Sequence, residues 1–370
     1  MTTELYTASR LRVLRQCLRL HYYRYELGLA MPQSDEARFG TVGHAALEAY
    51  LRTWQAGELD ARLDAALTIV DQLDSEFDRV KLRLLLVAYH ERWGAEDWDI
   101  LAVEVEFRYQ LGEHLLGGKI DAIIRQRTDG RVYVLEHKFT GVETSLGGAY
   151  WEKLTIDTQV SIYIDGATML GYEVAGCIYD VLKRPGHEPL RATPPDRREY
   201  TKGKGCRRCG GSAGGKDGIV QGRGSYSVVF GAEVKEVPCG ECDGTGWKKN
   251  KDGVPEAPRL HANQRDSDET VEVFEERLLG VIAESPDSWL QRSVVVRLEH
   301  ELPAMRNDLV DTIAIAELCT TREAWPRNGD ACARFGRMCS MFDLCSGRAS
   351  IDDEIRFPRG RAHPELATAI

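Results

Sequence analysis

The spacing of apolar residues along the chain changes from a helical to a strand period near residue 100. Three segments before it place apolar side chains three and four positions apart, which predicts helices: residues 8–27, 40–56 and 59–92. Three segments then alternate apolar and polar side chains, which predicts strands: residues 101–109, 115–127 and 131–139. Asp129-Gly130 lies between the last two, and this dipeptide is a strong hairpin signal.

The second half of the chain continues the alternation of helix and strand. Its apolar spacing predicts helices over residues 155–170, 268–285 and 306–320, and strands over residues 174–183 and 291–301. One segment, residues 201–253, is instead rich in Gly and Lys and carries two Cys-x-x-Cys pairs. A structureless loop of that length is uncommon inside a compact domain, so we predict a metal-stapled insertion. We therefore predict an α/β fold with the chain divided into three parts: residues 1–200, the insertion at residues 201–253, and residues 254–370.

Composition and charge restrict the class of protein. The chain has 370 residues, of which 43% are hydrophobic, and no apolar run approaches the ~20 residues that span a bilayer. The N-terminal segment has no apolar stretch of the secretory kind, so we expect a cytoplasmic protein, in a bacterium or a phage-infected cell. The net charge of −10 argues mildly against nucleic-acid binding, but residues 1–25 hold five Arg and one Glu, and residues 181–260 hold 16 Lys+Arg against 10 Asp+Glu.

The predicted hairpin carries three residues that suit metal-dependent hydrolysis of a phosphodiester. Asp121 lies on one strand, and Glu136 and Lys138 lie two apart on the other, so their side chains share a face while His137 points to the opposite face. Mg²⁺ and Mn²⁺ prefer carboxylate oxygens, and a nearby lysine can orient water or stabilise developing charge. A salt-bridged pair on an exposed strand face is the alternative for Glu136 and Lys138, although they interrupt an otherwise apolar strand.

Five segments in order resemble the RecB-like branch of the PD-(D/E)XK nucleases, which includes Cas4 and the AddB-type nuclease domains. These segments are YTASRLRVLRQCLRLHYYRYELGL, GTVGHAALEAYL, GGKIDAI, VLEHKFT and TQVSIY. The resemblance runs through most of the chain outside the Cys-rich insertion. It implies a restriction-endonuclease-like core, a mixed sheet flanked by helices, in which N- and C-terminal helical segments are joined by a metal cluster.

The resemblance also implies roles for particular residues. His44, Asp121 and Glu136, with the backbone carbonyl of His137, would bind Mg²⁺ or Mn²⁺. Lys138 would be catalytic, and Gln159 and Tyr163 would contact DNA or position the site. Taken as isolated residues, His44 reads as structural, and Gln159 and Tyr163 read as ordinary surface side chains.

The resemblance further implies a [4Fe–4S] cluster that holds the two ends of the chain together. Three cysteines near the C-terminus are one short of the usual four, and the fourth would come from the first helix: Cys17, Cys332, Cys339 and Cys345. Here the first two C-terminal cysteines are separated by six residues, where the family commonly has two. Zinc bound by four thiolates, or free thiols, are the alternatives.

The insertion contains a second set of four cysteines. Two Cys-x-x-Cys pairs, each followed by glycine, predict a tetrahedral zinc site: Cys206, Cys209, Cys239 and Cys242. The second pair, CGECDGTG, resembles the knuckles of DnaJ-type zinc domains, but no J-domain is evident. The remaining two cysteines, Cys177 and Cys319, have apolar neighbours and are predicted to be buried core thiols.

These observations favour a metal-dependent DNA nuclease, most simply an exonuclease on single strands or DNA ends. Recombination, repair, phage replication and CRISPR adaptation are all compatible processes, and unwinding would need a separate helicase or recombination partner. A non-catalytic nucleic-acid-binding or assembly module with the same fold is the alternative, and a zinc-dependent chaperone cofactor rests only on CGECDGTG. The sequence leaves the oligomeric state open.

Overall fold

The computed structural model describes residues 4–30, 33–212, 220–231, 233–334, 337–361, 363 and 366. The chain divides into two compact units, residues 1–187 with 275–370, and residues 188–274. The second unit is wider than the predicted insertion because extended segments on both sides of it pair with each other. Backbone hydrogen bonds of 2.8 to 2.9 Å join Leu190 to Glu269, Thr193 to Arg265 and Thr201 to Arg259.

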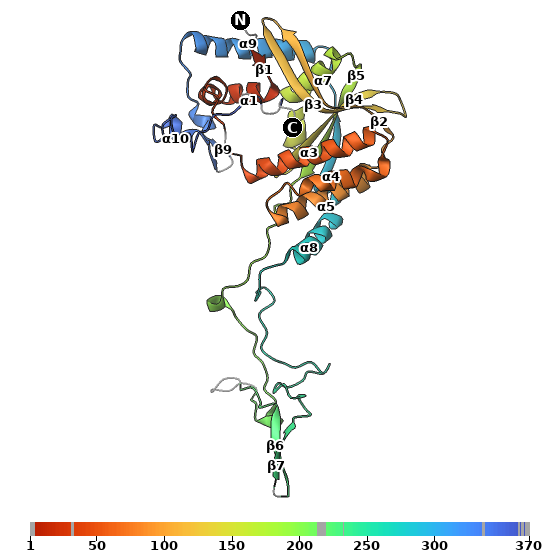
Figure 1. The fold of residues 1–370 in the computed structure, drawn as a ribbon, viewed down its shortest axis with the longest axis vertical. Coiled ribbons are helices and arrows are strands. Elements are labelled where there is room, and N and C mark those ends of the chain that lie inside the picture. The colour runs from red at the N-terminus through yellow and green to blue at the C-terminus, as the bar shows by residue number, and fades with distance from the viewer. Residues whose placement is uncertain are drawn as a thin grey trace. The chain divides into compact units, whose positions relative to one another are not determined.

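The first unit is built on a six-stranded mixed sheet (Figure 1). Its strands are β1 (Leu5–Tyr6), β2 (Trp98–Leu111), β3 (His114–Gln126), β4 (Val132–Thr140), β5 (Val174–Lys183) and β8 (Leu290–Val295). Strands β3, β4, β5 and β8 are neighbours in that order, with β4 and β5 parallel and the other two pairs antiparallel. The β3–β4 hairpin turns at Gly130, whose φ of 73° is readily adopted by glycine.

Helices cover both faces of this sheet. The α-helices of the described chain are α1 (Ala8–Gln16), α2 (Leu18–His21), α3 (Asp35–Gln55), α4 (Arg62–Val70), α5 (Glu76–Trp93), α6 (Ala149–Leu154), α7 (Thr158–Met169), α8 (Val271–Glu284), α9 (Glu301–Thr321) and α10 (Phe342–Cys345). A π-helical turn, Tyr22–Glu26, follows α2. No described helix is long and apolar enough to cross a membrane.

Two hydrophobic cores form because successive strand residues point to opposite faces. Helices α3, α4 and α5 contribute to one core, which also takes Leu135 of β4 and Ile178 of β5. Helices α1, α6, α7 and α9 contribute to the other, which takes the neighbouring residues Val134 and Cys177. Figure 1 shows α3, α4 and α5 lying together beside the sheet. The sheet is therefore buried on both faces, as its nearly continuous apolar strands require.

Several predicted boundaries differ from the observed ones. The segment 59–92 forms two α-helices, since the chain turns between α4 and α5 and Ser75 caps α5 by accepting a hydrogen bond from the Asp78 amide. Helix α3 begins at Asp35, five residues before the prediction, because Ser34 caps it in the same way. The first predicted helix is interrupted at Cys17, which has an extended backbone. Helix α6 was not predicted.

The second unit contains a hairpin of β6 (Ser225–Phe230) and β7 (Glu233–Pro238) beside four buried cysteines. The Cys239 amide donates to the Gly224 carbonyl, and the Cys206 amide donates to that of Gly246, each at 2.8 Å. Positive φ angles at Gly210, Gly244 and Gly246 allow the backbone to turn around the sulfurs. The glycines that follow each Cys-x-x-Cys pair thus allow the backbone turns that bring the four cysteines together.

Candidate active site

The candidate site lies at an interruption in the pairing of β3. Strand β2 pairs with β3 over most of its length, so β1 and β4 share the other edge of β3. Strand β1 pairs with β3 at residues 115–116, and β4 pairs with it at residues 122–125. Residues 117–121 of β3 pair with neither strand on this edge, and Asp121 is the last of them. Glu136 follows Leu135, the last residue of β4 that pairs with β3, so the two acids meet where these two strands part.

The direction of Asp121 depends on an irregularity shared by β2 and β3. Ile120 and Ala122 are two positions apart yet contribute to opposite cores, and so do Val105 and Val103 on the partner strand. Between the last two lies Glu104, whose φ of 53° is left-handed and rare for a residue other than glycine. The strand pair therefore changes face at Glu104 and Asp121, which frees both carboxylates from the regular alternation.

Glu136 is buried between the sheet and α7. The side-chain amide of Gln159 donates a hydrogen bond of 2.7 Å to Glu136 Oε1 and approaches the Tyr163 hydroxyl at 3.2 Å. The second oxygen, Glu136 Oε2, is buried and has no hydrogen-bond partner among the described residues. Burial, together with the charge of nearby Asp121, raises the pKa of Glu136 well above its usual value. A buried carboxylate oxygen without a partner suits a bound cation.

His44 reaches the same place from α3. Its Nδ1 lies 3.4 Å from Asp121 Oδ2, and its ring stands edge-on to Phe139. Helix α3 can come this close because residue 43 is glycine, where a Cβ atom would lie 2.4 Å from Phe139 Cζ. A hydrogen in place of a side chain at position 43 thus sets the distance between the histidine and the sheet.

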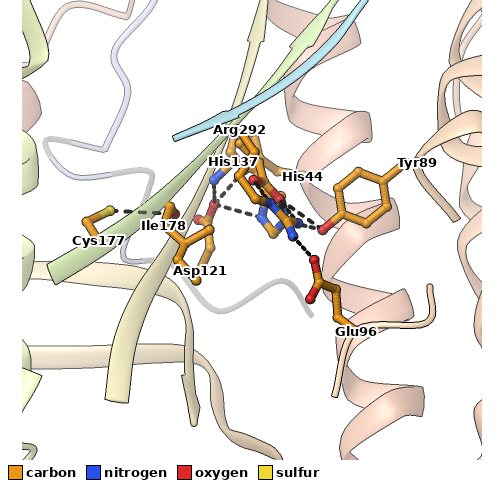
Figure 2. A network of polar contacts seen from close by, with 9 residues as sticks. His44, Tyr89, Glu96, Asp121, His137, Cys177, Ile178 and Arg292 are labelled. Atoms are coloured by element: carbon orange, nitrogen blue, oxygen red, sulfur yellow. Dashed lines mark hydrogen bonds and ion pairs between the residues drawn. The ribbon is translucent and has the colours of Figure 1, made fainter. Parts of the chain in front are cut away.

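Asp121 is held by histidines on two elements. Its Oδ2 accepts a hydrogen bond of 2.8 Å from the His137 backbone amide, and His137 Nδ1 lies 3.4 Å away (Figure 2). Burial by itself would raise the pKa of Asp121, but His44 and His137 outweigh that effect and lower it. The His137 ring lies on the α5 face, where it contacts Tyr89, whereas Glu136 contacts α7 on the other face.

These side chains line one cavity of about 400 Å³. The predicted site residues on its wall are His44, Asp121, Glu136, Lys138, Gln159 and Tyr163. The cavity also contains three charged residues that sequence reasoning missed: Glu48, Glu104 and Lys119. Glu104 forms an ion pair with Lys119, and burial raises the pKa of Glu104. Two acids in an alternating strand, VEVEF, carry no signal that one of them turns toward Asp121. The donor set of carboxylates and one imidazole suits a divalent cation such as Mg²⁺ or Mn²⁺.

A second group missed from the sequence lies behind Asp121. Tyr89, Asp180 and Arg292 connect to His137 through hydrogen bonds. Figure 2 labels Tyr89, His137 and Arg292. A signal for Asp180 was present, because it is an acid inside the apolar strand GCIYDVL, and a buried charge requires a partner. The other two residues have no such signal.

The four cysteines from the two ends of the chain line a second cavity, of about 30 Å³. Cys17 separates α1 from α2, and Cys345 ends α10. Cys332 and Cys339 flank a short hairpin, β9 (Ala333–Arg334) with β10 (Arg337–Met338), and the Cys339 amide donates to the Cys332 carbonyl at 2.7 Å. Pairing of β9 with β10 accounts for the unusual spacing, because it brings Cys332 and Cys339 together although six residues separate them. Residues 335–336 lie outside the described part.

The four cysteines of the second unit are gathered more tightly. Their sulfurs all lie within 4.8 Å of one another. The Sγ atoms of Cys206 and Cys239 are 3.9 Å apart, as are those of Cys209 and Cys242. A tetrahedron with metal–sulfur bonds of about 2.3 Å has edges of about 3.8 Å. The group therefore has the size of a single metal ion with four thiolate ligands.

Comparison with known proteins agrees with the arrangement of Asp121, Glu136 and Lys138 around one cavity. No curated protein matches the chain. A model of the PD-(D/E)XK nuclease superfamily matches residues 6–345, which is nearly the whole chain. The matched range includes both paired strands that carry Asp121, Glu136 and Lys138, and every cysteine of both groups. The chain belongs to the PD-(D/E)XK nuclease superfamily.

Proposed function

We propose that the protein is a metal-dependent DNA nuclease of the RecB-like kind, acting on single strands or DNA ends. The observation that carries this proposal is Glu136 Oε2, a buried oxygen without a partner in the described chain, in the same cavity as Asp121 and Lys138. Leaving such an atom unsatisfied costs about 1–3 kcal/mol. If no cation bound here, nothing would offset this cost. We would then expect Glu136, Asp121 or Lys138 to have been replaced.

The side chains divide into two roles. His44, Asp121, Glu136 and the His137 carbonyl would hold Mg²⁺ or Mn²⁺, which when bound neutralises charge on the scissile phosphate and lowers the pKa of water. Lys138 would orient the attacking water or stabilise charge that develops on the phosphate. Gln159 holds one oxygen of Glu136 in place and leaves the other free, and Tyr163 lies beside it as a contact for DNA.

The two cysteine groups would be structural. We assign a [4Fe–4S] cluster to Cys17, Cys332, Cys339 and Cys345, which link α1 and α2 to the C-terminal segment. We assign zinc to the tighter group of the second unit, where the sulfur spacing fits a single ion. Recombination, repair, phage replication and CRISPR adaptation are the processes that such an enzyme would serve, and a separate helicase would supply any unwinding.

The test is DNA degradation by protein purified without oxygen. End-labelled single-stranded, double-stranded and circular DNA would be incubated with Mn²⁺, Mg²⁺ or EDTA. Lys138→Ala should abolish cleavage without changing the melting temperature. Lys119→Ala is a matched control, because it removes another lysine from the same cavity whose charge is already paired with Glu104.

The outcomes separate the candidate functions. Metal-dependent cleavage that is lost in Lys138→Ala and kept in Lys119→Ala supports the proposal, and protection of circular DNA identifies an exonuclease. DNA binding without cleavage in every arm favours the non-catalytic binding module. Iron and zinc contents, measured on the same preparation, test the two cysteine assignments.

A further inference from the structure

A row of polar side chains crosses the sheet on the face opposite Glu136. His137 of β4 is the register partner of Asp180 on β5, and Asp180 is the register partner of Arg292 on β8. Neighbouring residues in register point to the same side of a sheet, so these three lie side by side. Asp121 of β3 continues the row through its contacts with His137 (Figure 2).

The far end of the row is fixed by Arg292. Its Nε and Nη2 donate hydrogen bonds of 2.5 and 2.6 Å to the two oxygens of Asp180, and its Nη1 donates one of 2.8 Å to Glu96. The guanidinium group lies over two indole rings, 4.1 Å from the centre of Trp93 and 4.7 Å from that of Trp98. Asp180 is fully buried, so this paired geometry determines where its charge lies.

The connection from Asp180 to the site passes through Tyr89 of α5. The Tyr89 hydroxyl donates to Asp180 Oδ2 at 3.2 Å and forms a second hydrogen bond of 3.1 Å with His137 Nε2, whose direction depends on the imidazole tautomer. The imidazole, which is 1% exposed, is thereby held in one orientation. Its backbone amide and its Nδ1 both face the same oxygen of Asp121.

Burying these charged side chains costs desolvation free energy, so a contribution to stability does not by itself explain the row. The neighbouring core is apolar, and well-packed apolar side chains can replace a buried ion pair with little loss of stability. Hydrogen bonds connect Arg292 through Asp180, Tyr89 and His137 to Asp121 Oδ2 without a break. Fixing that oxygen restricts the rotation of a carboxylate that lines the active-site cavity.

We propose that Tyr89, Asp180 and Arg292 are positioning residues that orient Asp121, through His137, for binding of a divalent cation. This inference rests on the proposed function, because it assigns the row to the same metal site. Partners of this kind behind a ligand commonly change metal affinity 10- to 100-fold when they are removed.

The chain offers a matched control for the test. Tyr109, Asp165 and Arg306 form a second group in which a tyrosine hydroxyl and an arginine bind a fully buried aspartate. That group does not contact Asp121 or His137. Tyr89→Phe and Tyr109→Phe each remove one hydroxyl from a buried aspartate and keep the ring, so both should lower stability to a similar extent.

The experiment is a Mn²⁺ titration of the full-length protein, followed by electron paramagnetic resonance and calorimetry. We expect Tyr89→Phe to raise the Kd for Mn²⁺ by about tenfold or more, and Tyr109→Phe to leave it within twofold. In the nuclease assay, Tyr89→Phe should need more Mn²⁺ for half-maximal cleavage and recover the wild-type kcat at saturating Mn²⁺.

The titration distinguishes failure of the proposed metal site from failure of the positioning role alone. A wild-type protein that binds no Mn²⁺ overturns the metal site and the inference together. Unchanged Mn²⁺ affinity in Tyr89→Phe, with binding intact in the wild type, overturns the inference alone. If Tyr89→Phe does not fold, Arg292→Lys receives the same titration, since it keeps the charge but loses the paired hydrogen bonds; unchanged affinity there also overturns it.

Discussion

Replacing Glu136 by glutamine should stabilise the cation-free protein while it removes the metal site. Glu136 Oε2 is buried without a partner in the described chain, and Asp121 lies close by, so ionised Glu136 is unfavourable in the folded state. An unsatisfied buried polar atom costs about 1–3 kcal/mol. Glutamine keeps a polar atom at this position but carries no charge, so it should avoid the penalty for ionisation and raise the melting temperature by about 2–6 °C.

The effect should depend on pH with a definite sign. The pKa of folded-state Glu136 lies well above the usual value of 4.5, because burial and Asp121 disfavour the charged form. The carboxyl group therefore contributes its full stability below pH 4.5 and loses it as pH rises toward the folded-state pKa. The stability advantage of Glu136→Gln should be small near pH 4.5 and grow toward pH 7.5.

Added Mn²⁺ should reverse the order of stability. At 100 times its Kd a ligand stabilises the folded state by about 2.7 kcal/mol. The wild type should gain this amount, while Glu136→Gln lacks a charged ligand and should gain little. Differential scanning fluorimetry at pH 4.5, 6 and 7.5, with and without Mn²⁺, measures both effects.

Glu143→Gln provides a control of opposite sign. Hydrogen bonds from Lys183 and Ser145 lower the pKa of this exposed carboxylate to about 2, so its replacement should give no gain at pH 7.5. A Glu136→Gln variant that melts at or below the wild-type temperature at pH 7.5 without cation would refute the reasoning. So would an equal rise of both proteins with Mn²⁺.

Two further predictions concern the backbone and the cysteines. Glu104→Gly should be about 1 kcal/mol more stable than Glu104→Ala in urea denaturation, the reverse of the usual order in a strand, because residue 104 has a left-handed φ; equal stabilities would contradict the face change. Cys239→Ser should lose the zinc and expose the second unit to protease while the first unit melts normally, whereas Cys339→Ser should lose the iron and lower the melting temperature of the first unit. Metal analysis and limited proteolysis check both, and unchanged metal content in either variant would contradict its assignment.

Regular structure was predictable because it follows from residue spacing. The strand predicted over residues 174–183 coincides with β5, and the three preceding strands and the hairpin turn at Gly130 lie where alternation and Asp-Gly placed them. The break between α4 and α5 was missed because apolar spacing continues through residues 71–75. The cap at Ser75 was visible in the sequence, but a serine in a polar stretch is not specific enough to end a helix.

The residues predicted for the site could be proposed from the sequence because they belong to local motifs. Alternation places Glu136 and Lys138 on one face, and the order of the segments adds His44, Gln159 and Tyr163, all of which line one cavity. Glu104, Tyr89 and Arg292 could not be proposed in this way. Each is recognised only by its contact with a residue distant in the sequence, and no spacing rule connects position 89 with positions 137, 180 and 292.

The failures of sequence rules that concern single residues gather around the site. Alternation predicts that Ile120 and Ala122 share a face, yet they enter different cores across Asp121. Strand preference predicts an extended backbone at Glu104, yet its φ is 53°. Burial predicts apolar side chains at positions 136 and 180, yet both are carboxylates. Each departure costs free energy, and each lies in the cavity of Asp121 and Glu136 or connects to it, so the cation binding that we propose there would account for all of them.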